Sequence, residues 1–194
     1  MREKQQSRYI EQIQAFAPCC EQEERDKELI LDLCSGANDI LTRKNRVFHF
    51  TSSGLILNEA RDKILMVHHN IYKTWTWTGG HTDGEADLEA VALREAGEET
   101  GVSRVRMILD HMASLDILPV YGHIKNGAYV SAHLHLNAAY LLCAFDTDKL
   151  TVQEQENSAV AWVTLDEIAQ HSGEQEILYI YRKMFTRLGI AFPG

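Results

Sequence analysis

Three glutamates that could bind a cation stand within one turn of a predicted helix. Glu95, Glu98 and Glu99 occur in the stretch REAGEETG, which begins with Arg94. Like charges three and four residues apart repel one another on a helix surface. A protein that keeps such a cluster either exposes it to water or uses it to hold a positive charge. The cluster is therefore a candidate cation site.

The position of these glutamates around the helix favours a buried site. At about 100° per residue they fall on the same side as several apolar residues, whereas a solvated acidic face should lie opposite them. The apolar residues on this side are Leu88, Val91 and Ala92. A second apolar side of the same helix leaves open that it is covered on both faces. We expect the three carboxylates to face inward.

Converging carboxylates in a partly desolvated place are costly unless a cation pairs them. Oxygen ligands in this number suit Mg²⁺ or Mn²⁺, and Mg²⁺ commonly binds the phosphates of a substrate as well. Arg94 is close enough to orient the carboxylates by charge-assisted hydrogen bonds. The pair Gly79–Gly80 allows the backbone to approach a ligand or metal, because no Cβ intervenes.

Composition bounds the class of protein. A chain of 194 residues with 45% hydrophobic and 24% charged residues suits one globular domain, with room for a small appendage. The net charge of −9 argues against general nucleic-acid binding, which depends on neutralising phosphates. An anionic protein can still bind phosphates through a divalent cation.

Location is predicted from what the sequence lacks. No apolar run reaches the roughly 18 residues of a membrane span, and the first residues lack the apolar core of a secretory signal. The four cysteines have no paired CxxC spacing and are expected to be free thiols in a reducing compartment; they are Cys19, Cys20, Cys34 and Cys143. We expect a cytoplasmic protein.

The chain divides into two predicted parts. Residues 1–44 predict a helical N-terminal extension, with helices over about 5–16 and about 21–34. Residues 45–194 predict a mixed α/β domain with one sheet between helices. Strands are expected over 49–58, 63–70, 74–78, 105–120, 132–145 and 159–164, and helices over 87–100, from a capping box at 164–167, and over 174–188. A loop is expected over 121–127.

The stretch GGHTDGEADLEAVALREAGEETGV closely resembles the Nudix box, G-x5-E-x7-R-E-U-x-E-E-x-G-U, in which U is apolar. The positions that match in register are Gly80, Arg94, Glu95, Ala96, Glu98, Glu99, Gly101 and Val102. The surrounding order of strands and helices, from about residue 49 onward, is also similar to a Nudix domain of the MutT-like type. Residues 49–84 further resemble a bacterial branch of the family, which indicates the fold and leaves the substrate open.

This resemblance implies a Nudix-type α/β/α sandwich with a mixed sheet and a site for divalent metal. It implies hydrolysis of a nucleoside diphosphate linked to another moiety, with Mg²⁺ or Mn²⁺ as cofactor. Glu98 and Glu99 would be metal ligands, and Glu95 a ligand or the general base. Gly80 would contribute a backbone carbonyl, and Arg94 would orient the glutamates. The ion would activate a water that attacks phosphorus while a carboxylate accepts its proton.

One position departs from the pattern. Its first glutamate falls on Ala86, with Glu85 one place earlier. The loop chemistry is thereby open, and Asp83, Glu85 or Asp87 could compensate. In many Nudix enzymes a further acid comes from a loop after the box, and here Glu154 and Glu156 are the candidates, with solvated linker charges as the alternative.

Several other side chains are candidates for substrate binding. His133 and His135 are two apart on a predicted strand and share a face; they could bind phosphate, metal or base, or be hydrogen-bonded on the sheet surface. His81 directly follows the glycines. Trp75 and Trp77 could stack a nucleobase, although at least one should be packed under the site. The pocket could also be shaped by Asp116, Tyr121 and Lys125.

Two other functions compete with hydrolysis. A Nudix-type isomerase of isopentenyl diphosphate would need a catalytic cysteine, whereas Cys143 lies in an apolar run. A nucleotide-sensing regulatory module without hydrolysis is the second, although the metal-binding glutamates are intact. The helix over about 21–34 is acidic, which disfavours DNA recognition. For the extension we expect a role as a lid or in a homodimer.

Overall fold

A computed structural model describes residues 2–36, 38–71, 73–125, 127–172 and 175–192. The helices are α1 (Arg2–Ala15), α2 (Glu21–Gly36), α3 (Leu88–Thr100), α4 (Ile168–His171) and α5 (Gln175–Arg187), with a 3₁₀ turn at Leu165–Glu167. The strands are β1 (Phe48–Leu57), β2 (Lys63–His69), β3 (Trp75–Thr76), β4 (Thr78–His81), β5 (Arg106–Met107), β6 (Ser114–Val120), β7 (His123–Lys125), β8 (Ala128–Val130), β9 (His133–Cys143) and β10 (Asn157–Thr164).

The main sheet is mixed. Its central strands run in the order β10-β2-β1-β9-β5, with β1 and β9 parallel and the other pairs antiparallel. β1 is shared between two antiparallel partners: residues 51–54 pair with β4, and residues 56–57 pair with β2. This division carries Gly79 and Gly80 directly alongside β1. The predicted mixed sheet is confirmed.

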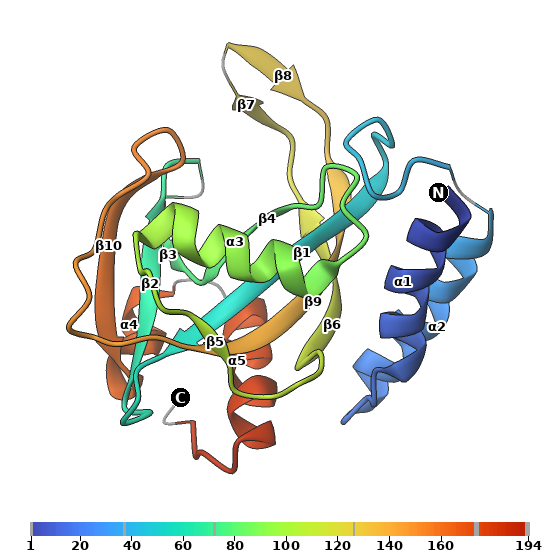
Figure 1. Cartoon of the computed structure of the whole chain (residues 1–194). Coiled ribbons are helices and arrows are strands. Elements are labelled where there is room, and N and C mark those ends of the chain that lie inside the picture. Colours follow the sequence, from blue (N-terminus) through green and yellow to red (C-terminus); the bar gives the residue numbers. More distant parts are fainter. Residues whose placement is uncertain (1, 37, 72, 126, 173–174, 193–194) are drawn as a thin grey trace.

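Helices cover both faces of the sheet (Figure 1). Side chains alternate along a strand, so neighbouring residues of β1 serve opposite faces. Phe50 and Ile56 lie in an apolar cluster with residues of α3, whereas Leu55 and Leu57 lie in a second cluster with residues of α5. The predicted α/β/α sandwich is confirmed. α3 begins at the N-cap Asp87 and ends at Gly101, whose φ of 78° is left-handed.

The two N-terminal helices pack onto the sandwich. Tyr9, Ile13 and Ile30 are buried in the same apolar cluster as Phe50 of the sheet, and the Tyr9 and Phe50 ring centroids lie 5.5 Å apart. The helical extension expected from the sequence is therefore present and shares a core with the sheet. The division of the chain after residue 44 stays a prediction.

A buried group of charges joins α2 to α5 and β6. Lys183 of α5 lies 3.3 Å from the Glu23 carboxylate and also pairs with Asp116 of β6. Arg187 pairs with Glu23 at 2.8 Å. Breaking such a group leaves an uncompensated buried charge, so it fixes α2 in place. Asp116 is committed to this contact and does not shape a substrate pocket.

Two segments differ from the sequence prediction. The single strand expected over 105–120 is interrupted: β5 and β6 both pair with β9, and residues 108–113 turn between them. The expected loop over 121–127 contributes to a small hairpin of β7 and β8, which projects beyond the sandwich (Figure 1). The exposed polar residues Asp110 and His111 lie in the turn over 108–113, and they mark the interruption of the expected strand.

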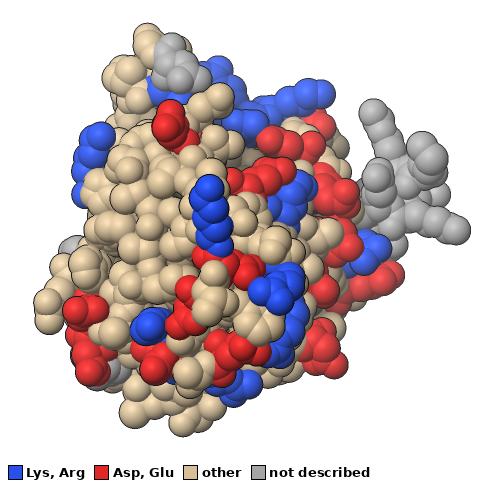
Figure 2. Space-filling model, turned by 60° about the vertical axis from the view of Figure 1, so that its left-hand side comes forward, with Lys and Arg blue, Asp and Glu red and all other residues tan. Residues whose placement is uncertain are grey.

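The surface carries mixed charge. On the face shown in Figure 2, acidic and basic side chains border one another around a broad uncharged area. Among the described helices, none combines the length and the apolar character that crossing a bilayer requires.

Candidate functional site

A cavity of about 680 Å³ lies where β1, β4 and β9 meet the C-terminal half of α3. The loop before β10 and the β7–β8 hairpin contribute further wall residues. Its acidic lining residues are Asp83, Glu95, Glu98, Glu99 and Glu156, and its basic ones include Arg43, Arg46 and Lys125. The glutamates that are clustered in the sequence therefore share one cavity with a smaller set of cations.

Glu99 is the most deeply buried of these carboxylates, with 3% of the residue exposed. Its Oε2 accepts a hydrogen bond from the backbone N–H of Gly79 at 2.8 Å, and its Oε1 accepts one from the Asn157 side chain at 2.9 Å. Burial nevertheless raises the pKa of Glu99 to about 7, and the charges of Glu95 and Glu156 add to this effect. A cation would stabilise the ionised form.

Glu95 touches the backbone of β4. A Cβ added to Gly80 would overlap the Glu95 carboxylate, so a larger residue there would push this carboxylate out of its present position. Arg94 donates a hydrogen bond to Glu95 Oε1 at 2.9 Å, which holds the carboxylate in place as expected. Burial raises the pKa of Glu95, and the hydrogen bond from Arg94 opposes this.

Glu98 and Glu156 lie at the open side of the cavity. The Glu98 side chain is 58% exposed, with the Arg94 guanidinium 3.9 Å away, so the expectation that all three glutamates face inward is wrong for Glu98. Glu156 is exposed. Burial is the main cause of the raised pKa values of Glu95 and Glu99, and the negative charge of Glu156 adds to it. Of the two linker candidates, Glu156 lines the cavity, and Glu154 is absent from the described lining.

The loop that leads into α3 is held by the N-terminal extension. Ala86, which stands at the first glutamate of the pattern, is 1% exposed and lies in the apolar cluster that contains Tyr9 and Ile13. The Gly84 N–H donates to the Leu41 carbonyl at 2.8 Å. The extension thus covers the side of the loop on which Ala86 lies, and a small apolar residue fits there.

The carboxylates considered as substitutes are otherwise engaged. Asp83 accepts two hydrogen bonds from Arg43, at 3.0 and 2.7 Å. Glu85 accepts from the Asp87 N–H at 2.9 Å, and Asp87 caps α3 by accepting from the Ala90 N–H at 3.4 Å. Of the three, only Asp83 is found among the described cavity residues. Each of these three carboxylates thus has a structural partner of its own.

The three histidines proposed for substrate binding all line the cavity and are joined by a fourth, His49. Ring centroids of His49 lie 5.0 Å from His81 and 5.1 Å from His135, and the His133 and His135 Nε2 atoms are 3.2 Å apart. Burial lowers the pKa of His81 to about 3 and that of His135 to about 2. The His81 and His135 rings are therefore neutral at pH 7.

Two residues of the site were not predicted from the sequence. His49 is the register partner of His135 on the parallel strand β1, and Asn157 follows the exposed linker to hold Glu99. Neither stands in a local motif, so only the strand pairing could have revealed them. Trp77 is buried against Tyr181, with ring centroids 5.0 Å apart, as expected for a tryptophan under the site. Trp75 is half-buried at the cavity wall.

Comparisons with known proteins agree with this arrangement. A family profile described as "NUDIX domain" matches residues 48–184. The human protein "Nucleoside diphosphate-linked moiety X motif 6" is 24% identical over 151 residues, which cover 71% of this chain and 44% of that protein. Its Xenopus laevis counterpart is 28% identical over 121 residues, 60% of this chain and 50% of that protein. This chain thus spans about half the length of these relatives.

A solved structure shares the fold. The C. elegans Ap4A hydrolase in a binary complex superposes with a TM-score of 0.55 at 18% sequence identity. The match covers 72% of this chain and 97% of that one.

Placing a glutamate at position 86, as in the family pattern, should lower the free energy of unfolding. Ala86→Glu would bury a carboxylate without a partner in the cluster with Tyr9, which costs about 3–5 kcal/mol. The measurement is the free energy of unfolding in denaturant, with Ala90→Glu, at an exposed position of α3, as the matched control. Equal stability of the two variants would contradict the burial of position 86.

Removing the charge of Glu99 should stabilise the metal-free protein. A glutamate side chain in water has a pKa of 4.5, and burial in the fold raises the pKa of Glu99 to about 7. Its ionisation therefore leaves stability unchanged below pH 4.5, lowers it between pH 4.5 and about 7, and has a constant effect above. Glutamine offers one acceptor where the carboxylate offers two, to Gly79 and Asn157, so part of its effect is the same at every pH. We expect the Tm of Glu99→Gln in chelator, relative to wild type, to be a few degrees higher at pH 8 than at pH 4.5.

The control for this experiment is Glu89→Gln on the same helix, whose Tm difference from wild type should not follow this pH profile. A loss of stability in Glu99→Gln that is equal at both pH values would contradict the account.

Proposed function

The chain belongs to the NUDIX family, and from this we propose that it is a metal-dependent hydrolase. Its substrate would be a nucleoside diphosphate linked to another moiety, cleaved at the pyrophosphate bond. The observation that carries the proposal is the convergence of Glu95, Glu98 and Glu99 in one cavity with Glu156. A fold alone does not imply function, whereas this group of carboxylates supports a specific chemistry.

The residues of the site fit a divalent ion. Glu99 is a buried carboxylate whose raised pKa reports charge that the protein only partly stabilises. The Glu95 carboxylate lies directly against Gly80 of β4, where a Cβ would displace it. The donors are carboxylate oxygens, which suit Mg²⁺ or Mn²⁺. We propose that Glu95, Glu98, Glu99 and the Gly80 carbonyl hold the ion.

The bound ion would neutralise charge on the phosphates and lower the pKa of a water. The protein's own residues supply the rest. Glu95 is half-enclosed and its pKa is raised, which suits a group that accepts a proton from the attacking water. Arg94 keeps the Glu95 carboxylate in one orientation. Glu156 stands at the rim as a second acid that can reach the same space.

The rest of the cavity suits an anionic ligand of nucleotide size. Its volume of about 680 Å³ falls in the range of small-molecule sites. Arg43, Arg46 and Lys125 in its wall can pair with phosphates. Asn137 lines the same cavity and has a buried Nδ2 without a hydrogen-bond partner in the described structure, which leaves a donor for a ligand.

Several parts of the proposal rest on the sequence alone. These are the identity of the metal as Mg²⁺ or Mn²⁺, a cytoplasmic location, a homodimer, and the absence of nucleic-acid binding, all of which stay predictions. A nucleotide sensor without hydrolysis is the alternative. The convergence of the box carboxylates around a space for an ion favours the hydrolase.

A panel assay tests the proposal. Nucleotide sugars, dinucleoside polyphosphates, oxidised nucleotides and coenzyme diphosphates are incubated with the chain, with and without Mg²⁺, and phosphate-containing products are measured. We expect Mg²⁺-dependent turnover of at least one class. Glu98→Gln should lower kcat/KM by about 100-fold, at the upper end of the loss seen when a metal site loses a supporting residue.

The matched control is Glu89→Gln, which changes a glutamate of α3 outside the described cavity and should retain wild-type turnover. Full activity of Glu98→Gln would refute the metal assignment. Tight binding of one compound with no turnover of any would favour the sensor.

A further inference from the structure

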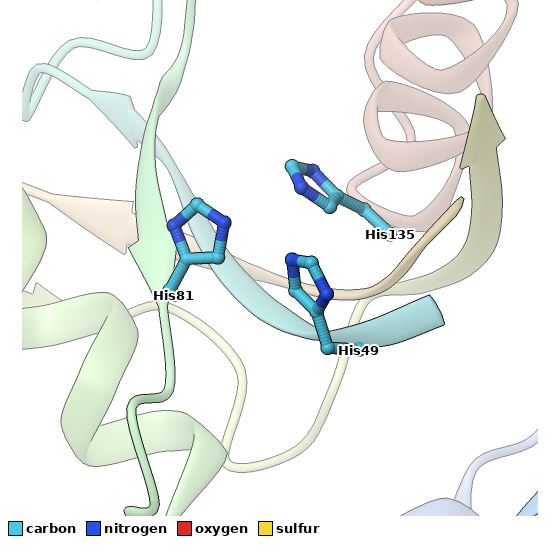
Figure 3. A group of neighbouring side chains, drawn as sticks. All are labelled: His49, His81 and His135. Atoms are coloured by element: carbon cyan, nitrogen blue, oxygen red, sulfur yellow. The ribbon is translucent and has the colours of Figure 1, made fainter. Parts of the chain in front are cut away.

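Three histidines converge from three paired strands onto one point of the cavity. His49 lies on β1, His81 on β4 and His135 on β9, and Figure 3 shows their rings facing a common space. One potential ligand nitrogen of each lies within 4.8 Å of those of the other two. Because strands are rigid supports, the group is preorganised by the sheet.

The strand register explains the convergence. His49 is the direct partner of His135 in the parallel β1–β9 pair, so the two side chains stand on the same face. His81 is the partner of Thr51 in the antiparallel β1–β4 pair, two residues along β1 from His49. Two residues along a strand return to the same face. All three rings therefore rise from one side of the sheet.

A hydrogen bond at the back of the His49 ring leaves a nitrogen lone pair for a ligand. His49 Nδ1 donates to the Asn45 carbonyl at 3.0 Å. Its Nε2 is then an acceptor, and this atom is buried with no partner in the described structure. A backbone carbonyl on the far nitrogen is the usual support of a metal-binding histidine. Because His49 lines the cavity, this lone pair is available to a ligand there.

His133 supports the third ring. Its Nδ1 donates to the Ser131 carbonyl at 2.8 Å, so its Nε2 accepts, and the Nε2 of His135 lies 3.2 Å away and can donate to it. A metal held by His135 Nε2 would replace this hydrogen bond, whereas Nδ1 carries the lone pair while Nε2 is protonated. His133 orients the third ring through this contact.

We propose that His49, His81 and His135 form a binding site for a divalent transition metal of the Zn²⁺ type. Zn²⁺ takes imidazole nitrogens at about 2.0–2.1 Å, which sets nitrogens about 3.3 Å apart in a tetrahedron, so small side-chain rotations suffice. Three histidines leave a fourth position for water or a substrate oxygen. Mg²⁺ prefers oxygen ligands, so this site differs in selectivity from the carboxylates.

The position of this histidine site in the cavity indicates that its metal would contact the substrate. His81 directly follows Gly80, which touches Glu95, and both groups of residues line the same cavity. A histidine-bound metal would therefore meet the same anionic substrate as the carboxylates and could bind a second oxygen of it. This second metal site goes beyond the hydrolase proposed above, and it can be tested without any turnover.

The test measures metal binding by the untagged full chain, stripped with chelator and then kept in millimolar Mg²⁺ so that oxygen-ligand sites are filled. Co²⁺ is added and its visible absorption is recorded, because four-coordinate nitrogen sites absorb far more strongly than six-coordinate oxygen sites. Zn²⁺ affinity is then measured by competition with a chromogenic chelator. We expect one equivalent of Co²⁺ with strong absorption, displaced by Zn²⁺.

The variants assign the ligands. His49→Gln and His135→Gln should each weaken Zn²⁺ binding by more than about tenfold. The exposed His111→Gln is the matched control, and Glu98→Gln separates this site from the carboxylates; both should bind Zn²⁺ as wild type does. Circular dichroism checks folding, and His81→Gln replaces either ligand variant that fails to fold.

Weak Co²⁺ absorption in the wild type, or Zn²⁺ affinity that survives in the folded histidine variants, would overturn the proposal. A histidine substitution that weakens the binding of inorganic pyrophosphate while the wild type binds no Zn²⁺ would also overturn it, and would assign the rings to phosphate.

Discussion

The arrangement of the site depends on the burial of the Glu99 carboxylate. Moving a charge out of water is unfavourable unless hydrogen bonds and an opposite charge replace the lost solvation. Gly79 and Asn157 supply two hydrogen bonds, and the pKa remains raised to about 7, so the compensation is incomplete. The neighbouring features follow from this constraint. β4 approaches α3 closely, Gly80 makes room for Glu95, and the loop before β10 brings Asn157 and Glu156 to the same place.

The N-terminal extension is a structural part of the same site. α1 and α2 share an apolar cluster with the sheet and with Ala86, and the segment after α2 binds the loop through Leu41 and Arg43. These contacts fix the entry to α3, whose last turns carry the glutamates. The extension thus buries the loop position where the family pattern has a carboxylate. Its acidic helix α2 is anchored through Glu23 to two basic residues of α5.

The sequence predicted the parts of the fold and site that short segments encode. Glycine spacing and the helix caps act over a few residues, so α3 and its ends were predicted correctly, whereas the roles of Gly80 and Arg94 in the site stay predictions. His49, Asn157 and the burial of Ala86 depend on strand pairing and on the packing of a distant helix, which no local pattern contains. The turn between β5 and β6 was missed because apolar residues before and after it favour a single strand, although Asp110 and His111 within it are exposed. The prediction that Glu98 faces inward was wrong, because the position of a residue around a helix does not show how far the covering strand extends.

The central claim is that the box carboxylates bind one divalent ion together with the Gly80 carbonyl. The most direct measurement is a crystal structure of the chain with Mn²⁺, in which anomalous scattering locates the ion. The account predicts an anomalous peak within coordination distance of Glu98, Glu99 and the Gly80 oxygen. A well-occupied Mn²⁺ elsewhere, with these carboxylates free of metal, would contradict it.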